Sequence, residues 1–299
     1  MRNALKNADS KQLQQRLQLH VERLAGMIGP RHLGLPSTME AAAEYVRREL
    51  AGAGKVETQP YDIDGRQVVN IVLERLGERR PGEIVILGAH YDTVPETPGA
   101  DDNASAVAVM IEAARLLKDA PLGRTVRFVG FPCEEPPHFR MGTMGSQVYA
   151  ARCRKNSERV VGMLCLEMVG YFTSQAGSQQ APGGLPKYLR WLLPTRGDFL
   201  AAVGNIRSWR LCWQFWRGFR LASRLRIRAV VLQDKVHAIR LSDNSSFWDQ
   251  GYPALMITDT SFLRNPNYHT PGDTPDSLDY ASMAKVCLGV SGALLRIAR

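Results

Sequence analysis

The sequence has few cysteines and no pattern among them. Five cysteines are scattered over 299 residues, and none forms a C-x-x-C pair. An odd, dispersed set argues against a disulfide framework and is typical of reduced thiols in a reducing compartment. Two of them, Cys133 and Cys165, lie in strand-like runs near Glu134 and Glu167, and we interpret both as core-filling residues.

Long hydrophobic runs are also missing. We find no apolar stretch of the ~18–20 residues that a membrane span needs, and the polar N-terminus has no secretory apolar core. We therefore expect a cytoplasmic location and no transmembrane segment. The hydrophobic content of 44% and the charged content of 22% are those of an ordinary globular protein. The length suits one domain over residues 1–299.

Acidic residues are scarce in one segment. Residues 187–240 contain 12 lysines and arginines but 2 acidic residues, and four of the chain's five tryptophans. Within a basic, Trp-rich helical insertion at about 171–228, residues 207–228 predict an amphipathic helix. This helix has three interpretations. It could bind nucleic acid or an anionic membrane, cap the fold beside a functional site, or line a substrate pocket. We favour the cap and expect no nucleic-acid partner, because Trp and Arg stems also cover apolar surface well.

Elsewhere, apolar periodicity predicts alternating strands and helices. Strands are expected at 56–63, 67–76, 83–88, 125–132, 160–168, 229–233 and 254–259, and helices at 11–27, 37–50, 103–118, 145–154, from 242, and at 280–297. Ser37 and Thr38, with Glu40 nearby, predict a capped start for the second helix. The alternation predicts an α/β fold, a three-layer doubly wound and mostly parallel sheet with helices on both faces.

Polar residues follow the apolar runs where the strands are expected to end. In doubly wound sheets ligands bind outside the carboxyl ends of the strands, so these side chains have a topological reason to meet. Each has a structural alternative: His90 with Asp92 is often a hydrogen-bonding pair, and Asp101-Asp102 is often a helix N-cap. The adjacent carboxylates of Glu134-Glu135 are more informative, because they repel each other unless a cation compensates. Glu167 lies inside an apolar strand, where a buried carboxylate is also costly unless a cation compensates its charge.

Taken together, five motifs resemble the zinc-dependent aminopeptidase family that also contains glutaminyl cyclases and glutamate carboxypeptidases. The motifs are GAHYDT, GADDNAS, an EE pair ten residues before MGS, LEM and YHTPGDTPD, in family order between Gly88 and Tyr280. The resemblance implies two zinc ions. It places His90 and Glu167 on one ion, Glu135 and His269 on the other, and Asp102 as a bridge between them.

The resemblance also implies a reaction. Glu134 matches the glutamate that binds no metal and serves as general base, and Asp92 matches a residue that orients the His90 ring. The implied activity is hydrolysis of the first peptide bond of a peptide by zinc-activated water. Two other functions stay open, a glutaminyl-cyclase-like acyltransferase with one zinc and a binding protein that has lost activity.

The chain departs from the family pattern near the site. The loop that is usually EE-x-GL-x-GS reads EEPPHFRMGTMGS, and its His138 and Arg140 are candidates for substrate contact or for plain surface positions. Residues 242–244 read SDN where the family often has SDH, so Asn244 replaces the histidine. This replacement leaves the substrate specificity open.

Overall fold

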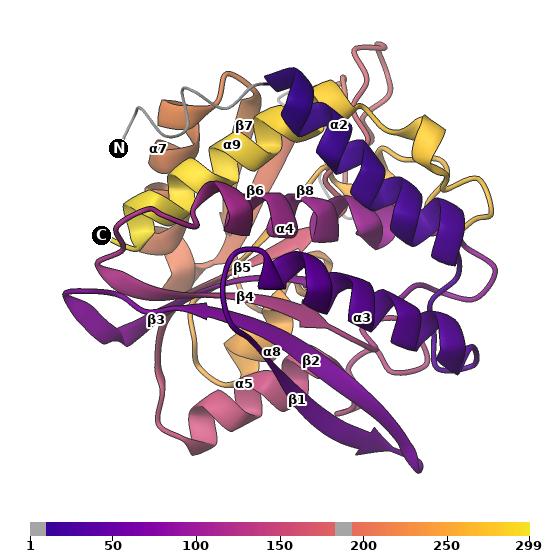
Figure 1. Cartoon of the computed structure of the whole chain (residues 1–299). Coiled ribbons are helices and arrows are strands. Elements are labelled where there is room, and N and C mark those ends of the chain that lie inside the picture. Colours follow the sequence, from indigo (N-terminus) through magenta and orange to yellow (C-terminus); the bar gives the residue numbers. More distant parts are fainter. Residues whose placement is uncertain (1–9, 183–192) are drawn as a thin grey trace.

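The computed structural model describes residues 10–182 and 193–299, so part of the basic segment lies outside the described residues. An eight-stranded sheet forms its centre (Figure 1). The strands are β1 (Val56–Ile63), β2 (Arg66–Arg75), β3 (Arg80–His90), β4 (Arg124–Phe131), β5 (Arg159–Glu167), β6 (Phe199–Asn205), β7 (Arg226–Leu232) and β8 (Ala254–Thr258).

The spatial order of the strands is β1-β2-β4-β3-β5-β8-β6-β7. The central strands β4, β3, β5 and β8 run parallel, and β6 runs parallel to β7. Antiparallel pairs join β1 to β2, β2 to β4 and β6 to β8. The α/β fold with a mostly parallel sheet is therefore confirmed, with antiparallel strands added on both sides of the parallel centre.

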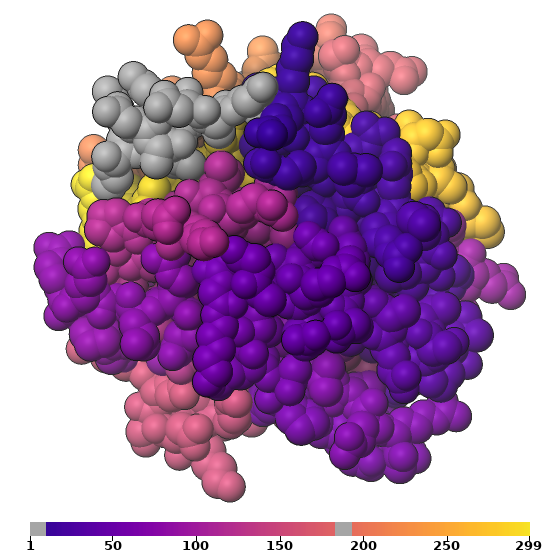
Figure 2. Space-filling view, in the orientation of Figure 1, coloured from indigo at the N-terminus to yellow at the C-terminus, as the bar shows by residue number. Residues whose placement is uncertain are grey.

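Helices cover both faces of this sheet. They are α2 (Ser10–Val21), continued by η1 (Glu22–Ile28), α3 (Pro36–Ala51), α4 (Ala106–Leu116), α5 (Gly145–Lys155), α7 (Trp209–Ala222), α8 (Asn244–Asp249) and α9 (Tyr280–Ile297). Short turns are η2 (Ala100–Ser105), η3 (Ile206–Ser208), η4 (His237–Arg240), η5 (Ser261–Leu263) and η6 (Pro275–Ser277). The larger core packs α2, α3, α4, α7 and α9 on one face, and α5 and α8 pack on the other. The first part of the chain covers most of the face seen in Figure 2.

Helix α9 is apolar for a structural reason. By length and composition it could cross a membrane, although the sequence analysis expected no such segment. In the fold, 67% of this 18-residue window is buried. It packs against α7, α2 and α4, so its apolar character is explained by its place in the core.

Two local expectations were wrong. No strand was predicted within 171–228, yet the apolar run FLAAVGN forms β6, and the helix expected to reach Arg228 ends at Ala222 before β7 begins. The expected cap of α3 is also missing. Leu35 precedes the helix without a side-chain cap bond, and the Thr38 hydroxyl donates instead to the Pro30 carbonyl at 2.7 Å.

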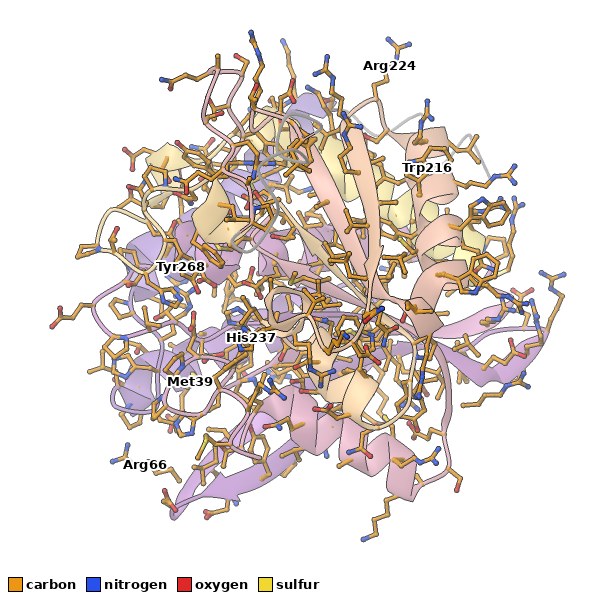
Figure 3. All side chains as sticks on the ribbon, turned by 180° about the vertical axis from the view of Figure 1, so that it is seen from behind. Met39, Arg66, Trp216, Arg224, His237 and Tyr268 are labelled. Atoms are coloured by element: carbon orange, nitrogen blue, oxygen red, sulfur yellow. The ribbon has the colours of Figure 1, made fainter. Side chains whose placement is uncertain are left out.

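The amphipathic helix α7 docks its apolar face on α9. Phe215 and Phe219 are fully buried there, whereas Trp209 and Trp213 on the outer face are 54% and 48% exposed. Figure 3 shows Trp216, also on α7, on the opposite side of the molecule from Tyr268, which precedes the candidate ligand His269. The apolar face is buried as the cap interpretation expected, but α7 docks on α9 rather than beside the polar cluster described next.

Candidate metal centre

Two parallel strands place the first group of candidate ligands. His90 ends β3, and Glu167 ends the neighbouring strand β5, so both side chains leave the sheet at the same edge. The His90 Nε2 atom lies 3.4 Å from Glu167 Oε2 and 3.3 Å from Asp102 Oδ1. One nitrogen and two carboxylate oxygens thus converge on one buried point.

Asp102 also faces a second group. Its other oxygen, Oδ2, lies 3.2 Å from His269 Nε2, and the same nitrogen lies 3.3 Å from Glu135 Oε1. Glu135 follows β4, and His269 lies in the loop after β8. The two oxygens of one aspartate therefore point at two separate sets of ligand atoms, an arrangement that suits a bridging carboxylate.

The donor atoms fit a metal better than they fit one another. Within the described residues, His90 Nε2, Asp102 Oδ1 and His269 Nε2 are buried and have no hydrogen-bond partner. The ligand atoms of His90, Asp102 and Glu167 lie within 4.8 Å of one another, as do those of Asp102, Glu135 and His269. Imidazole nitrogens and carboxylate oxygens in threes are the donors that zinc takes at sites that keep a position open for water.

Burial of so many carboxylates changes their protonation. Burial raises the pKa of Glu135 to about 8, and the nearby Asp102 carboxylate adds to the rise. Burial also raises the pKa of Glu134, helped by Glu135 and Glu167 and opposed by His90. For His269, burial lowers the pKa, but the nearby carboxylates of Asp102 and Glu135 outweigh burial and raise it to about 10. In all three groups neighbouring carboxylates add to the rise in pKa, and a bound cation would offset this negative charge.

Glu134 lies beside both groups, and with His90 and Glu135 it forms a third set of donor atoms that lie within 4.8 Å of one another. Its Oε2 atom is 3.9 Å from His90 Nε2, and its side chain is buried. Its backbone is held by Asp92, whose Oδ1 accepts from the Glu134 amide at 3.1 Å and whose Oδ2 accepts from the Glu135 amide at 3.0 Å. The same Oδ1 lies 3.5 Å from His90 Nδ1. Asp92 was predicted only as the partner of His90; the structure adds the backbone of the glutamate pair.

Other polar residues hold the side chains or the backbone of the candidate ligands, a role that was not predicted from the sequence. The Ser242 hydroxyl donates to Glu167 Oε2 at 2.5 Å. Asn103 accepts from the Met168 amide and donates to the Leu166 carbonyl, and so holds the backbone on both sides of Glu167. Asp273 accepts from the amides of residues 101 and 102. Ser242 and Asp273 belong to the quoted SDN and YHTPGDT motifs, which were the available signal for them.

Several structural alternatives can now be decided. Asp101 does not cap a helix; it is buried and accepts from the Gly170 amide at 2.8 Å and from Asn265 at 2.8 Å. Among the described residues, the groups that could hold a metal contain no cysteine. Cys133 and Cys165 are both buried, as core-filling residues should be.

The departures from the family pattern fall in different places. His138 lines a cavity next to Glu135, and Arg140 is absent from that cavity's wall. Asn244 is fully buried and donates to the Ile239 carbonyl at 2.9 Å. Of these three residues, His138 is therefore the one that this cavity brings next to a candidate ligand.

Comparison with known proteins shows the family to which the sequence is similar. A sequence profile of peptidase family M28 matches residues 70–293. The Escherichia coli protein YfbL is 38% identical over 298 residues, covering 96% of this chain and 90% of its own. The chain also matches fungal leucine aminopeptidases, but it spans less than two thirds of their length.

Solved structures show the same fold at low identity. The zinc aminopeptidase BSAP from Bacillus subtilis aligns with a TM-score of 0.70 and 16% identity, covering 96% of this chain and 95% of that one. The glutaminyl cyclase of Porphyromonas gingivalis aligns with a TM-score of 0.68 and 21% identity, covering 94% and 97%. With the profile match spanning most of its length, the chain belongs to peptidase family M28.

Proposed function

We propose that the chain is a zinc-dependent aminopeptidase that holds two ions and removes the first residue of a peptide. Membership of a peptidase family supports peptide hydrolysis, and the zinc aminopeptidase with the same fold supports the metal. The observation that carries the proposal is Asp102, whose two oxygens face two sets of buried donors. His90 and Glu167 would hold one ion, and Glu135 and His269 the other.

Hydrolysis needs a Lewis acid and a group that transfers protons. Bound zinc would supply a Lewis acid that polarises the scissile carbonyl and makes a water molecule more acidic. Glu134 would accept the proton of the attacking water and later donate it to the leaving amine. Burial raises the pKa of Glu134, which suits a carboxylate that must take up a proton and then return it.

Asp92 would act by positioning. Its two oxygens hold the amides of Glu134 and Glu135, and an asparagine can accept only one of these two bonds. We expect Asp92→Asn to lower kcat/KM by about 10- to 100-fold, the range seen when groups that orient metal ligands are changed. Steady-state kinetics with zinc quantification measure the loss. An unchanged kcat/KM would remove Asp92 from this role.

The direct test uses two model substrates and metal analysis. We expect about two zinc ions per chain and a release of naphthylamine from leucyl-β-naphthylamide that a chelator abolishes and zinc restores. One zinc ion, with pyroglutamate formed from a glutaminyl substrate, would instead support the cyclase alternative, which the shared fold leaves as second candidate. Protein that binds no zinc and turns over neither substrate would support a binding protein.

The proposed location is the cytoplasm. The five cysteines are free and buried, which suits a reducing compartment. Cell fractionation tests this: recovery with periplasmic or membrane markers would contradict it.

A further inference from the structure

A cavity of about 370 Å³ opens beside the candidate metal centre. Asp92 and Glu135 form part of its inner wall, and His32, Arg66 and His138 lie along the rest. Its size falls at the lower end of the range of small-ligand sites, roughly 300–1,000 Å³. A cavity that starts at a candidate ligand and has this size suits a short piece of substrate.

Besides the segment after β3 that contains Asp92, three segments form the wall of this cavity. His32 precedes α3, Arg66 begins β2 at the tip of the β1–β2 hairpin, and His138 lies in the EEPPHFRMGTMGS loop. Figure 3 shows Arg66 on the same side of the molecule as Tyr268. The loop that departs from the family pattern therefore contributes one side of this cavity.

Three nitrogen-bearing side chains line the cavity outside the candidate ligands. The rim carries Arg66, His32 and His138 against the single carboxylate of Asp64, which lies on the hairpin turn. Asp92 and Glu135 are engaged at the inner end, with the glutamate backbone and with His269 respectively. Outside the candidate ligands, the wall therefore offers N–H donors from three side chains, with the carboxylate of Asp64 on the hairpin turn.

Each of these three side chains makes one contact within the protein, which leaves other nitrogen atoms available to a ligand. Arg66 Nη1 donates to the Leu33 carbonyl at 2.6 Å, which uses one of the five N–H donors of a guanidinium. The His32 Nδ1 atom accepts from the Gly34 amide at 3.1 Å, so a neutral His32 carries its proton on Nε2. The His138 Nδ1 atom contacts the Thr143 hydroxyl at 3.2 Å, which fixes that ring. Arg66 and a neutral His32 can each offer a further N–H to a ligand, and His138 can do so in the tautomer whose Nδ1 accepts from Thr143.

We propose that this cavity binds the carboxyl-side part of a di- or tripeptide and that Arg66, with His32 and His138, recognises its free terminal carboxylate. The inference rests on the proposed aminopeptidase function, which puts the first peptide bond at the metal centre. A planar guanidinium matches a carboxylate with paired, charge-assisted hydrogen bonds. The chain of a longer peptide would have to pass out of the cavity between these same side chains. The cavity therefore favours short peptides.

The test compares a free acid with its amide on the zinc-loaded enzyme. We expect kcat/KM for Leu-Ala to exceed that for Leu-Ala-amide by about tenfold, mainly through a lower KM, because one charged contact contributes about that factor. Arg66→Gln should bring this ratio near one by lowering kcat/KM for the free acid. His138→Gln should lower the ratio in part. Arg47→Gln is the matched control, since Arg47 is exposed on α3 and pairs with Glu44.

The outcomes separate the two proposals. If the wild-type enzyme hydrolyses the amide as fast as the acid, or if Arg66→Gln keeps the preference, the carboxylate site is wrong while the aminopeptidase stands. If neither compound is hydrolysed, the proposed function fails. Calorimetric binding of Leu-Ala and its amide to zinc-loaded protein then decides the site by itself, because equal affinities, or none for either, overturn it.

Discussion

We expect Glu134→Gln to retain its zinc and to lose about two or more orders of magnitude in kcat. Glutamine keeps the size of the side chain but cannot accept a proton, so the metal groups around His90 and His269 should stay intact. The Glu134 carboxylate lies outside the two ligand groups that share Asp102. It also lies in a third possible group with His90 and Glu135, and the zinc content of the variant tests that alternative. Turnover of leucyl-β-naphthylamide and zinc content should be measured on the same preparation.

Glu57→Gln is the matched control for this variant. Glu57 is exposed on β1, pairs with Lys55 at 3.0 Å and has no proposed role in catalysis. It should keep wild-type kcat and wild-type zinc content. If Glu134→Gln behaved as Glu57→Gln does, Glu134 would not be the general base. If it lost zinc instead, Glu134 would be a ligand.

Asp102→Ala should have the second large effect, a loss of zinc from both groups of ligands. The variant removes the two oxygens that face His90 and His269 at 3.3 Å and 3.2 Å. Each ion would keep two protein ligands, and structural or catalytic zinc sites ordinarily use three or four. We expect zinc to fall from about two ions per chain to well under one after dialysis, and activity to fall with it.

A folding control keeps this result interpretable. The far-ultraviolet circular dichroism of Asp102→Ala should match that of the wild type stripped of metal, so that lost zinc is not mistaken for lost fold. Asp249→Ala, which removes a surface partner of Arg240, should keep both ions. Retention of both ions by Asp102→Ala would show that Asp102 does not bridge them.

The sequence predicted the central sheet because its strands are buried on both faces. Continuous apolar runs such as EIVILG and TVRFVGFP mark strands of this kind, and their ends locate His90 and the glutamate pair. The convergence of distant side chains then followed from one rule, that neighbouring parallel strands end at the same edge. The resemblance to the zinc aminopeptidases contributed the assignment of roles.

What the sequence did not predict depends on tertiary pairing. The run that forms β6 is short and precedes a strongly amphipathic helix, so its strand character was masked by the basic segment around it. The antiparallel direction of β2 against β4 leaves no mark on either strand alone. The expected cap at Ser37 failed because Pro36 already begins the helix, and Thr38 bonds outward to the Pro30 carbonyl.

The positioning residues were missed for a related reason. Ser242 acts on Glu167 from 75 residues away, and Asp273 acts on the Asp102 amide from 171 residues away. A serine before a short helix and an aspartate in a Pro/Gly loop have many ordinary uses. Only the fold brings them next to the ligands.

The most direct measurement is an anomalous diffraction map at the zinc edge from crystals grown with zinc. We predict two peaks, one among His90, Asp102 and Glu167, and one among Asp102, Glu135 and His269, with Glu134 binding neither ion. A map with no peak at either place, or with His90 and His269 turned away from Asp102, would contradict the account.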